Sequence, residues 1–567
     1  MSTASPTLTY QQAFERLTAP GSPLELESVT GPYGPERRFA HAPPDLGSLL
    51  DRAEAYGERP CLHYGERSMT YRAFIEAARK VAAGLLTHAE KGERVAILGA
   101  NHPDWMLAFW GALYAGLVPT PLNGWWRRQE LEHAISYTRP KLLIGDAKRL
   151  AKLQIPDAGP LPADKVFCWD RPEAHARFLP FSVLQESVPA GPQAVSSEDL
   201  AALIFTSGTT GKAKAAAITH GAWITGLMNG LLASMIELTR RPGLQAQSDV
   251  VTVLAGLPFF HVGGGHGLVV GGIAGGQVLV IPDGRFSPVE TLRLIEAYSI
   301  ERWSAVPAMV QQVCHHGNRE GRDLSSLLTL GYGAAPSGQA LQQAAEALFP
   351  NLRAITNAYG MTEASSVFAM NTGENLKQRP DSVGRPFATA QLRVVGEGGT
   401  PLPTGKTGEV QVRGPFLMRE YWEAPEATKA IFAPGGWLRT GDLGRLDEEG
   451  FLYLSGRQKD IIIRGGENIL AEEVERCLET HTGILEAAVI GVPSEALGEE
   501  LKAVLVTHGP DVPDDLAVRE WVGQSLAHFK VPRYVEFRNT PLPRNAAGKI
   551  LKRELAQKGS TQFDELL

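Results

Sequence analysis

Apolar residues in the first two hundred positions follow helical spacing and strand spacing in turn. They recur at helical spacing over Tyr71–Leu86 and Pro103–Ala115, and they form short continuous runs over Arg94–Leu98 and Lys141–Gly145. Such short runs are typical of buried strands. Because strands that alternate with helices form a parallel sheet covered by helices, this part of the chain predicts an α/β fold.

A second apolar pattern begins after residue 200. The run Leu203–Phe205 predicts a buried strand, and a longer apolar stripe downstream marks one face of a long helix. A stripe of this kind is typical of a helix that packs against the core. Its members are Trp223, Ile224, Leu227, Met228, Leu231, Leu232 and Met235.

The segment Val250–Pro282 contains no Asp, Glu, Lys or Arg and has to be tested as a membrane span. It is interrupted by Pro258 and by many glycines, whereas a spanning helix needs about twenty continuous apolar residues. We therefore expect two short strands, Val251–Leu254 and Gln277–Ile281, around a buried glycine-rich helix.

The pattern changes near Gly456. Upstream of this point, Gly441–Gly444 and Glu449–Gly450 punctuate short apolar runs that are typical of hairpins. Downstream, strand and helix patterns follow one another at short spacing, which predicts a C-terminal α+β domain of about one hundred residues. The expected strands are Asp460–Ile463, Ala487–Val492, Leu501–Val506 and Tyr534–Phe537, and the expected helices are Ala471–Leu478 and Asp515–Leu526.

Composition narrows the class of protein. A length of 567 residues is too great for a single core, so two or more domains are expected. The net charge of −7 leaves no dominant basic field and argues against nucleic acid as a partner. The N-terminal residues lack the basic flank and apolar stretch of a secretory signal. With no transmembrane segment predicted, we expect a cytoplasmic protein whose oligomeric state, monomer or homodimer, stays open.

The cysteines agree with a reducing compartment. They are scattered, with no CxxC pair and no His/Cys ligand spacing, so they give no indication of a zinc site. The four residues are Cys61, Cys168, Cys314 and Cys477.

A loop rich in hydroxyl groups, glycines and lysines directly follows the predicted strand Leu203–Phe205. Glycines let backbone N–H groups turn toward a ligand, and hydroxyls and lysines add donors and positive charge, which suits a polyphosphate. Only two residues separate the glycines, so the loop does not match the common nucleotide P-loop. An ordinary surface turn is the alternative. The loop consists of Thr206, Ser207, Gly208, Thr209, Thr210, Gly211, Lys212, Ala213 and Lys214.

Further motifs carry the groups that a nucleotide site needs. Tyr359–Glu363 combines an aromatic ring, a hydroxyl and a carboxylate, which can stack on a base, bond a phosphate and hold Mg²⁺. Thr440–Asp442 offers a carboxylate for a vicinal diol such as ribose. Gly456–Asp460 lies at the expected domain junction, and Lys549 lies in a basic stretch near the C-terminus. Taken singly, each motif has an ordinary alternative: a capped loop, a turn, a surface ion pair and a solvated lysine.

Together, the order and spacing of these motifs resemble the adenylate-forming superfamily, which contains acyl-CoA synthetases, luciferases and the adenylation domains of peptide synthetases. The resemblance extends from about Met69 to Leu555 and is closest to fatty-acid or other carboxylic acid–CoA ligases. It implies a large N-terminal domain over residues 1–456, with parallel-rich sheets, helices and a distorted β-barrel-like part. It also implies a hinge over residues 457–460 and a small mobile α+β lid domain over residues 461–567.

The resemblance assigns roles to residues of the N-terminal domain. Thr206–Lys214 is similar to the loop that binds the β- and γ-phosphates. Gly333, Ala334 and Ala335 resemble the segment beside the adenine, with Tyr359 against the base. Thr362 is implied to bond the α-phosphate, Glu363 to hold Mg²⁺, and Asp442 and Arg457 to contact the ribose. His261 matches an element beside the carboxylate and the path by which the thiol enters.

Residues near the hinge and in the lid domain also match the family. Lys459 falls at the hinge position, where many relatives carry aspartate, and Lys549 matches the mobile catalytic lysine. The loop Gly465, Gly466 and Glu467 is implied to face the thiol donor after the lid rotates. The phosphate loop departs from the family at Ala213, where proline is usual, and at Ala215, where glycine is usual. Neither change removes a donor, so we expect an altered loop that still binds.

The resemblance implies two half-reactions that use ATP, Mg²⁺ and coenzyme A. A carboxylate attacks the α-phosphorus of ATP to give an acyl-adenylate and pyrophosphate, and a thiol then attacks the acyl carbon and releases AMP. A stand-alone enzyme that loads a carrier protein, a luciferase-like oxygenase and a nucleotide-binding pseudoenzyme are the alternatives. Retention of Thr362, Glu363, Asp442, Arg457 and Lys549 argues against the pseudoenzyme, because a protein that only binds a nucleotide needs no catalytic lysine.

The acid is indicated only by the composition of the expected pocket walls. They are mostly apolar or small, with no basic partner for a second carboxylate and no acidic partner for an α-amine. An extended apolar acyl chain therefore fits best, which predicts a medium- or long-chain fatty acid. An aryl or alicyclic acid is the close alternative. The expected walls are Leu227–Met235, the glycines after His261, Trp303–Met309 and Gly331–Gly333.

Overall fold

The structure is a computed structural model that describes residues 8–155, 163–189, 191–206, 213–241, 250–316, 321–333, 339–494, 497–508, 512–545 and 548–559. Two groups of residues with expected nucleotide contacts lie outside these ranges. They are Ser207, Gly208, Thr209, Thr210 and Gly211 of the phosphate loop, and Ala334 and Ala335 of the adenine segment.

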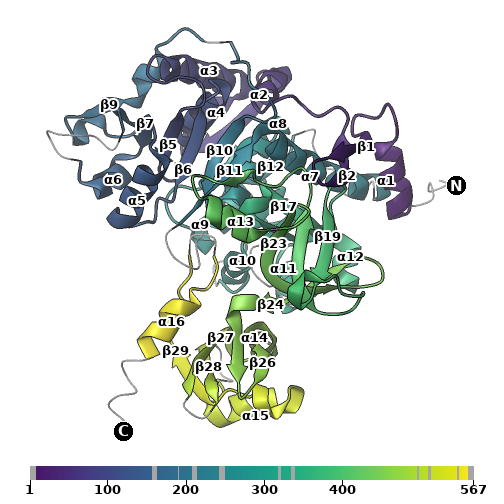
Figure 1. Cartoon of the computed structure of the whole chain (residues 1–567). Helices are drawn as coiled ribbons and strands as arrows, with labels where there is room; N and C mark the ends of the chain where they lie inside the picture. The colour runs from purple at the N-terminus through teal and green to yellow at the C-terminus, as the bar shows by residue number, and fades with distance from the viewer. Residues whose placement is uncertain are drawn as a thin grey trace.

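The alternating pattern near the N-terminus forms a five-stranded parallel sheet, as predicted (Figure 1). Its strands, in spatial order, are β6 (Val118–Leu122), β5 (Arg94–Leu98), β7 (Leu142–Gly145), β8 (Lys165–Cys168) and β9 (Phe178–Pro180). The helices of this region are α2 (Gly47–Arg52), α3 (Tyr71–Leu86), α4 (Pro103–Tyr114), α5 (Arg128–Thr138) and α6 (Ala147–Leu150). The predicted bounds of α3 and β5 are confirmed.

A larger, fourteen-stranded sheet forms the centre of the molecule. Its parallel part is β3 (Pro60–Tyr64), β13 (Val278–Val280), β12 (Thr252–Leu254), β14 (Arg302–Ala305), β15 (Thr329–Gly333) and β16 (Ala354–Met361). The antiparallel remainder is β4 (Arg67–Thr70), β17 (Ser366–Thr372), β18 (Ser382–Pro386), β24 (Leu452–Arg457), β23 (Trp437–Leu446), β22 (Phe432–Ala433), β20 (Gly408–Arg413) and β19 (Gln391–Val395). Four helices of this region are α9 (Pro288–Ala297), α10 (Pro307–Cys314), α11 (Gln339–Leu348) and α12 (Gly373–Gln378).

The two sheets enclose a layer of helices. Every residue of α4 is buried, as expected for a helix that is apolar on all sides. One hydrophobic core joins α3 and α4 to β5 and β7 on one side and to β12 and β13 on the other. The same core receives the long helix α7 (His220–Arg240). The predicted stripe on α7 is largely buried, but Leu231 is wrongly placed in it, since it is 52% exposed.

The charge-free segment folds as predicted. β12 and β13 flank a glycine-rich helical stretch formed by the π-helical segment η6 (Gly263–Val270) and α8 (Gly271–Ala274). The indole Nε1 of Trp110 on α4 donates to the carbonyl of Val269 at 3.1 Å, which ties this stretch to the core. Within the described residues, none of the helices is both long and apolar enough to span a membrane.

A three-stranded antiparallel sheet carries the phosphate loop. It consists of β10 (Leu200–Phe205), β11 (Ala215–Thr219) and β21 (Glu420–Tyr421), and helix α13 (Pro425–Ile431) follows β21. One prediction for the strands after residue 437 is wrong. Gly441–Gly444 does not punctuate short strands but lies inside the ten-residue strand β23. A positive φ of 70° at Gly441 and a shift in register between Leu443 and Gly444 let the strand continue.

The N-terminal residues, which matched no motif, connect two parts of the large domain. Helix α1 (Tyr10–Thr18) packs against α7, and the hairpin β1 (Leu26–Gly31) and β2 (Gly34–Phe39) reaches toward the antiparallel strands. There Arg413 donates from Nη1 to the carbonyl of Tyr33 at 3.0 Å.

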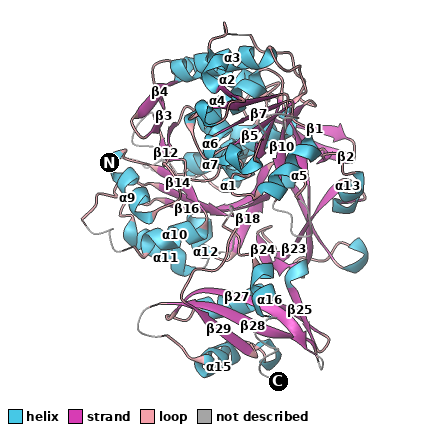
Figure 2. Ribbon diagram, turned by 90° about the vertical axis from the view of Figure 1, so that its left-hand side faces the viewer, coloured by secondary structure: helices cyan, strands magenta, loops and turns pink. Residues whose placement is uncertain are grey.

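A separate five-stranded sheet follows β24 and forms the small C-terminal unit below the large one in Figures 1 and 2. Its strands are β25 (Ile461–Arg464), β26 (Glu467–Leu470), β27 (Ile484–Ser494), β28 (Gly498–Thr507) and β29 (Tyr534–Arg538), and its helices are α14 (Ala471–Glu479), α15 (Asp515–Ser525) and α16 (Lys552–Gly559). All six expected elements are present. The short strand β26 escaped prediction because it follows two glycines and lacks a clear apolar alternation.

Candidate active site

Several of the predicted catalytic and nucleotide-contacting residues come together where the large sheet meets the C-terminal unit. Tyr359 lies near the end of β16, and the single-turn helix η8 (Thr362–Ala364) follows that strand directly. Asp442 on β23 and Arg457 on β24 lie opposite one another in the antiparallel register. Ligands of open α/β sheets bind beyond the carboxyl ends of the parallel strands, and β16 ends at this point.

Asp442 is the centre of a compact polar cluster. The Tyr359 hydroxyl donates to Asp442 Oδ2 at 2.7 Å, and the Arg457 guanidinium lies 2.9 Å from Oδ1 through its Nε. Burial raises the pKa of Tyr359, with a further contribution from the charge of Asp442, so its hydroxyl remains a donor. A carboxylate has about four acceptor sites, so Asp442 retains capacity for the two hydroxyls of a ribose.

Glu363 is buried beside this cluster, and a residue that sequence reasoning missed holds it in place. The hydroxyl of Tyr421 on β21 donates to Glu363 Oε1 at 2.6 Å, and the backbone N–H of Met418 donates to the Glu363 carbonyl at 2.8 Å. Burial raises the pKa of Glu363, and the bond from Tyr421 opposes this effect. Tyr421 has no neighbouring motif, so only its pairing with β11 in the fold reveals its position.

The ends of the phosphate loop reach the same place. The backbone N–H of Thr206 donates to the carbonyl of Lys214 at 2.8 Å, which closes the loop between β10 and β11. The Lys214 ammonium lies 5.6 Å from the centre of the Tyr421 ring, a cation–π arrangement. Ala215, an exception to the family pattern, is fully buried opposite Phe205 and is accommodated without disturbing the hairpin.

Two lysines approach the Asp442 cluster from the C-terminal side. Lys459 lies in the turn η10 (Gln458–Asp460) that joins the two units, and burial together with the charge of Arg457 lowers its pKa to about 8. Lys549 is half-buried; burial, followed by the charges of Arg457 and Lys459, lowers its pKa to about 7. The loop of Lys549 touches the large domain, since a Cβ on Gly548 would lie 2.6 Å from Val306.

We expect ATP binding at pH 8 to take up a proton through Lys549. A pKa of about 7 leaves its ammonium mostly neutral at pH 8, and a nearby triphosphate favours the charged form and raises the pKa. Titration calorimetry in buffers of different ionisation enthalpy measures the uptake. The proton uptake should fall in Lys549→Ala, which lacks the ammonium, and also in Lys549→Arg, whose side chain is charged throughout. It should vanish near pH 5.5, where the ammonium of Lys549 is already charged. Unchanged uptake in both variants would contradict the assignment.

Other predicted residues lie apart from this cluster or contact it only through the backbone. Gly465 and Gly466 form the exposed turn between β25 and β26, and the exposed Glu467 begins β26. Gly333 ends β15, where a Cβ would lie 2.6 Å from the carbonyl oxygen of Ala358, so only glycine fits.

His261 lies in the turn before η6. No hydrogen bond or ion pair between described side chains joins it to Glu363 or Lys549. Its turn is held by Asn101, which sequence reasoning missed. Asn101 accepts from the Phe259 N–H at 2.9 Å and donates to the carbonyl of Leu257 at 2.8 Å. Burial lowers the pKa of His261, which favours a neutral ring.

The carboxylate of Glu363 suits a divalent cation that is bound together with substrate phosphates. Among the described residues, no group of three or more His, Cys, Asp or Glu side chains could hold a metal ion alone. Mg²⁺ is commonly bound by one or two carboxylates plus substrate phosphates. Glu363, a buried carboxylate near the phosphate loop, fits that mode.

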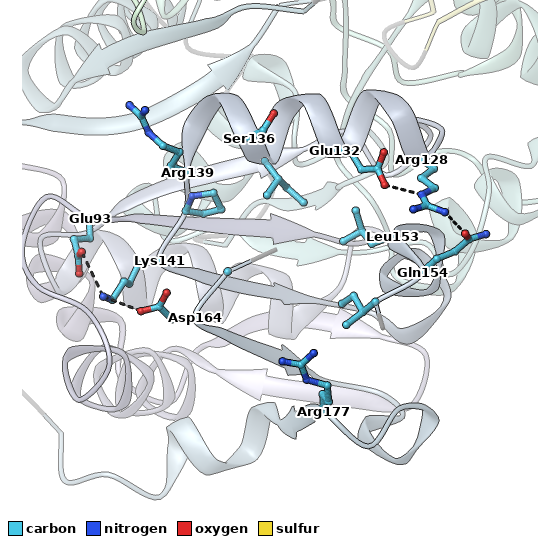
Figure 3. Close-up of a pocket in the computed structure, with 14 residues that line it drawn as sticks. Glu93, Arg128, Glu132, Ser136, Arg139, Lys141, Leu153, Gln154, Asp164 and Arg177 are labelled. Atoms are coloured by element: carbon cyan, nitrogen blue, oxygen red, sulfur yellow. Dashed lines mark hydrogen bonds and ion pairs between the residues drawn. The ribbon is translucent and has the colours of Figure 1, made fainter. Parts of the chain in front are cut away.

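A separate hollow of about 890 Å³ lies between α5 and the strands β7 and β8 (Figure 3). None of the residues that line it belongs to the Asp442 cluster. Two pairs of its charged side chains contact one another, Lys141 with Asp164 at 2.8 Å and Arg128 with Glu132 at 2.6 Å. This hollow is therefore not the site of the predicted chemistry.

Comparison with known proteins agrees with this arrangement. Residues 49–422 match the family described as AMP-binding enzyme, and residues 473–549 match the AMP-binding enzyme C-terminal domain. Feruloyl-CoA synthase of an Amycolatopsis species is 32% identical over 519 residues, covering 90% of this chain and 99% of that protein. A long-chain-fatty-acid–CoA ligase of Bacillus subtilis (strain 168) is 30% identical over 540 residues, covering 90% and 93%. The structure of o-succinylbenzoate CoA synthetase from Bacillus subtilis with its acyl-adenylate intermediate superposes with a TM-score of 0.74 at 27% identity, covering 90% and 98%.

Proposed function

The chain belongs to the AMP-binding enzyme family, and from that premise we propose that it activates a medium- or long-chain fatty acid. It is an ATP-dependent, AMP-forming carboxylic acid–CoA ligase. The observation that carries the proposed site is the joining of Glu363, Asp442, Arg457 and Lys549, which are far apart in the sequence, at one junction between two units.

The proposed chemistry begins with adenylate formation. Thr206–Lys214 binds the β- and γ-phosphates, Tyr359 lies against the adenine, and Asp442 and Arg457 contact the ribose. Thr362 bonds the α-phosphate, and the Lys549 ammonium offsets charge that develops as the acid attacks and pyrophosphate leaves. Mg²⁺, which Glu363 would hold, supplies further positive charge beside the phosphates when bound.

The second step requires Lys549 to leave the site. We propose that residues 461–567 rotate about the hinge 457–460, because the chain passes from the large sheet to the small one between Arg457 and Ile461. In such rotations, a few residues at the ends of secondary-structure elements commonly absorb the large change in backbone dihedral angles. The exposed turn Gly465–Glu467 would then face coenzyme A, and His261 would lie beside the path of the thiol.

The glycines after His261 support an extended acyl chain. Gly264 is required for packing, since a Cβ there would lie 2.1 Å from the Pro258 carbonyl oxygen. Gly263 and Gly267 lie four residues apart and are exposed, and a Cβ on Gly267 would meet nothing within 4 Å. This strip without side chains starts two residues after His261. Trp303, by contrast, is no wall of a pocket, because it packs against Phe349 in the core.

Pyrophosphate release with a panel of acids tests the proposed substrate. We expect saturated fatty acids of medium or long chain to give higher kcat/KM than ferulate, 4-coumarate or short-chain acids, because an apolar wall gains affinity with each methylene. A preference for the aryl acids would replace the fatty acid by the alternative that the feruloyl-CoA synthase likeness favours. Thioester formation with a phosphopantetheinyl carrier but not with coenzyme A would favour a carrier-loading enzyme.

A variant locates the acyl path within the same experiment. Gly267→Leu fills open space and should lower kcat/KM for long chains about 10-fold or more while short acids react as before. Gly191→Leu, at another exposed glycine with nothing within 4 Å, is the matched control. Equal effects of Gly267→Leu on all chain lengths would remove η6 from the acyl path.

A further inference from the structure

We propose that Arg544 is a positioning residue that fixes the loop of Lys549 through the carbonyl of Gly548. The proposal rests on the function proposed above, because it concerns the residue assigned there to adenylate formation. It goes beyond that function in naming how the small domain presents its lysine.

Arg544 spans the loop that carries Lys549. Its Nη1 donates to the Gly548 carbonyl at 2.8 Å, one peptide bond before Lys549. The loop is closed further by the backbone of Asn545, which donates to the Lys549 carbonyl at 2.9 Å, and by its side chain, which accepts from the Lys549 N–H at 2.9 Å. Lys549 therefore directly follows a carbonyl that one guanidinium holds.

Glu486 anchors that guanidinium to the small sheet. Its Oε1 lies 3.5 Å from Arg544 Nη2, and its Oε2 accepts from the Leu542 N–H at 2.9 Å. Glu486 lies on β27, and its side chain is 8% exposed. Because Glu486 is buried and fixed by the Leu542 N–H, the position of β27 is transmitted to Gly548 through two side chains.

The surroundings of Lys549 explain why its backbone has to be fixed. Burial, followed by the charges of Arg457 and Lys459, lowers the pKa of Lys549, so the site disfavours an ammonium before a polyphosphate arrives. A flexible four-carbon side chain would turn toward solvent under that repulsion. Holding Gly548 from one side by Arg544, while its other side packs on Val306, limits this escape.

Two half-reactions measured separately test the proposal. Arg544→Met should lower ATP–pyrophosphate exchange about 10- to 100-fold, as expected when a reacting group is displaced, and leave thioester formation from synthetic acyl-adenylate near the wild-type rate. In Arg544→Lys a single ammonium replaces the guanidinium fork, so ATP–pyrophosphate exchange should lie between that of the wild type and that of Arg544→Met. Arg519→Met is the matched control, because Arg519 pairs with Asp515 on α15.

A second background separates positioning from stability. Arg544→Met leaves the buried Glu486 without its cation, so the double variant Arg544→Met/Glu486→Gln removes that charge and still lacks the donor to Gly548. It should show the same loss of exchange with an unchanged melting temperature. In the Lys549→Ala background, Arg544→Met should cause no further loss, because the group on which it acts is gone.

Three outcomes would overturn the proposal. They are wild-type exchange in Arg544→Met, a parallel fall in both half-reactions, and an additive loss on top of Lys549→Ala. Failure of the proposed function has a different signature. In that case Lys549→Ala itself retains exchange, whatever Arg544→Met does.

Discussion

Lys549→Ala should reduce ATP–pyrophosphate exchange about 100-fold or more, while thioester formation from synthetic acyl-adenylate and coenzyme A largely survives. The loss follows because a preorganised charge at the transferring phosphoryl group contributes this much to a rate. Lys549 approaches the Asp442 cluster from the small domain, so its charge is present only when that domain is docked as described here. Radiolabelled pyrophosphate exchange and acyl-CoA formation measure the two steps separately.

A nearby lysine provides the control for this prediction. Lys552 begins α16, three residues further along, and its Nζ lies 2.7 Å from Glu475 Oε1 rather than in the cluster. Lys552→Ala should leave both half-reactions near wild type. Equal losses of the two half-reactions in Lys549→Ala would refute the role of Lys549, because a residue that leaves the site before thiol attack cannot slow both steps alike.

Elements with regular periodicity were predictable because their own residues determine them. Helix α3 spans Tyr71–Leu86 as predicted, since its apolar spacing is regular and Thr70 caps it by accepting from the Ala73 N–H. The elements of the C-terminal domain were predictable for the same reason. Strand β23 was not, because glycine weakens a strand pattern, and pairing with β20 and β24 keeps Gly441–Gly444 within one strand despite the positive φ of Gly441.

The sequence predicted the motifs of the candidate site, but it did not predict the residues from other elements that hold them in place. Tyr359, Glu363, Asp442 and Lys549 stand out because each is a chemically distinctive residue in a motif of fixed order. Tyr421 and Asn101 act by touching these motifs from other elements, and such contacts are set by tertiary packing. The sequence around Tyr421 and Asn101 gives no indication of these contacts.

The same limit applies to the acyl pocket. Composition marked Leu231 and Trp303 as equivalent apolar candidates, but the fold exposes the first and buries the second in the core. The glycines after His261 divide likewise into those that pack closely and those that face open space. Identifying pocket walls therefore requires the direction of each side chain, which apolar character alone does not supply.

Glu363→Gln should lower adenylate formation about 100-fold or more and raise the Mg²⁺ concentration needed for half-maximal exchange. The amide retains the shape of the side chain but not its negative charge, which is what would hold the cation beside the phosphates. Exchange measured against free Mg²⁺ at saturating ATP tests this. Glu420→Gln is the matched control, since Glu420 is the neighbour of Tyr421 on β21 and lies near Arg419.

Tyr421→Phe distinguishes a carboxylate that must be ionised from one that only fills space. Burial raises the pKa of Glu363, and the Tyr421 hydroxyl opposes that rise by bonding the charged form. Losing the hydroxyl should therefore raise the pKa further, so that the acid limb of the pH profile for exchange moves to higher pH. The loss should shrink as the pH rises above the acid limb, whereas Glu363→Gln has no charge to regain at any pH. An acid limb that stays in place, together with a normal Mg²⁺ requirement in Glu363→Gln, would assign the cation to another group.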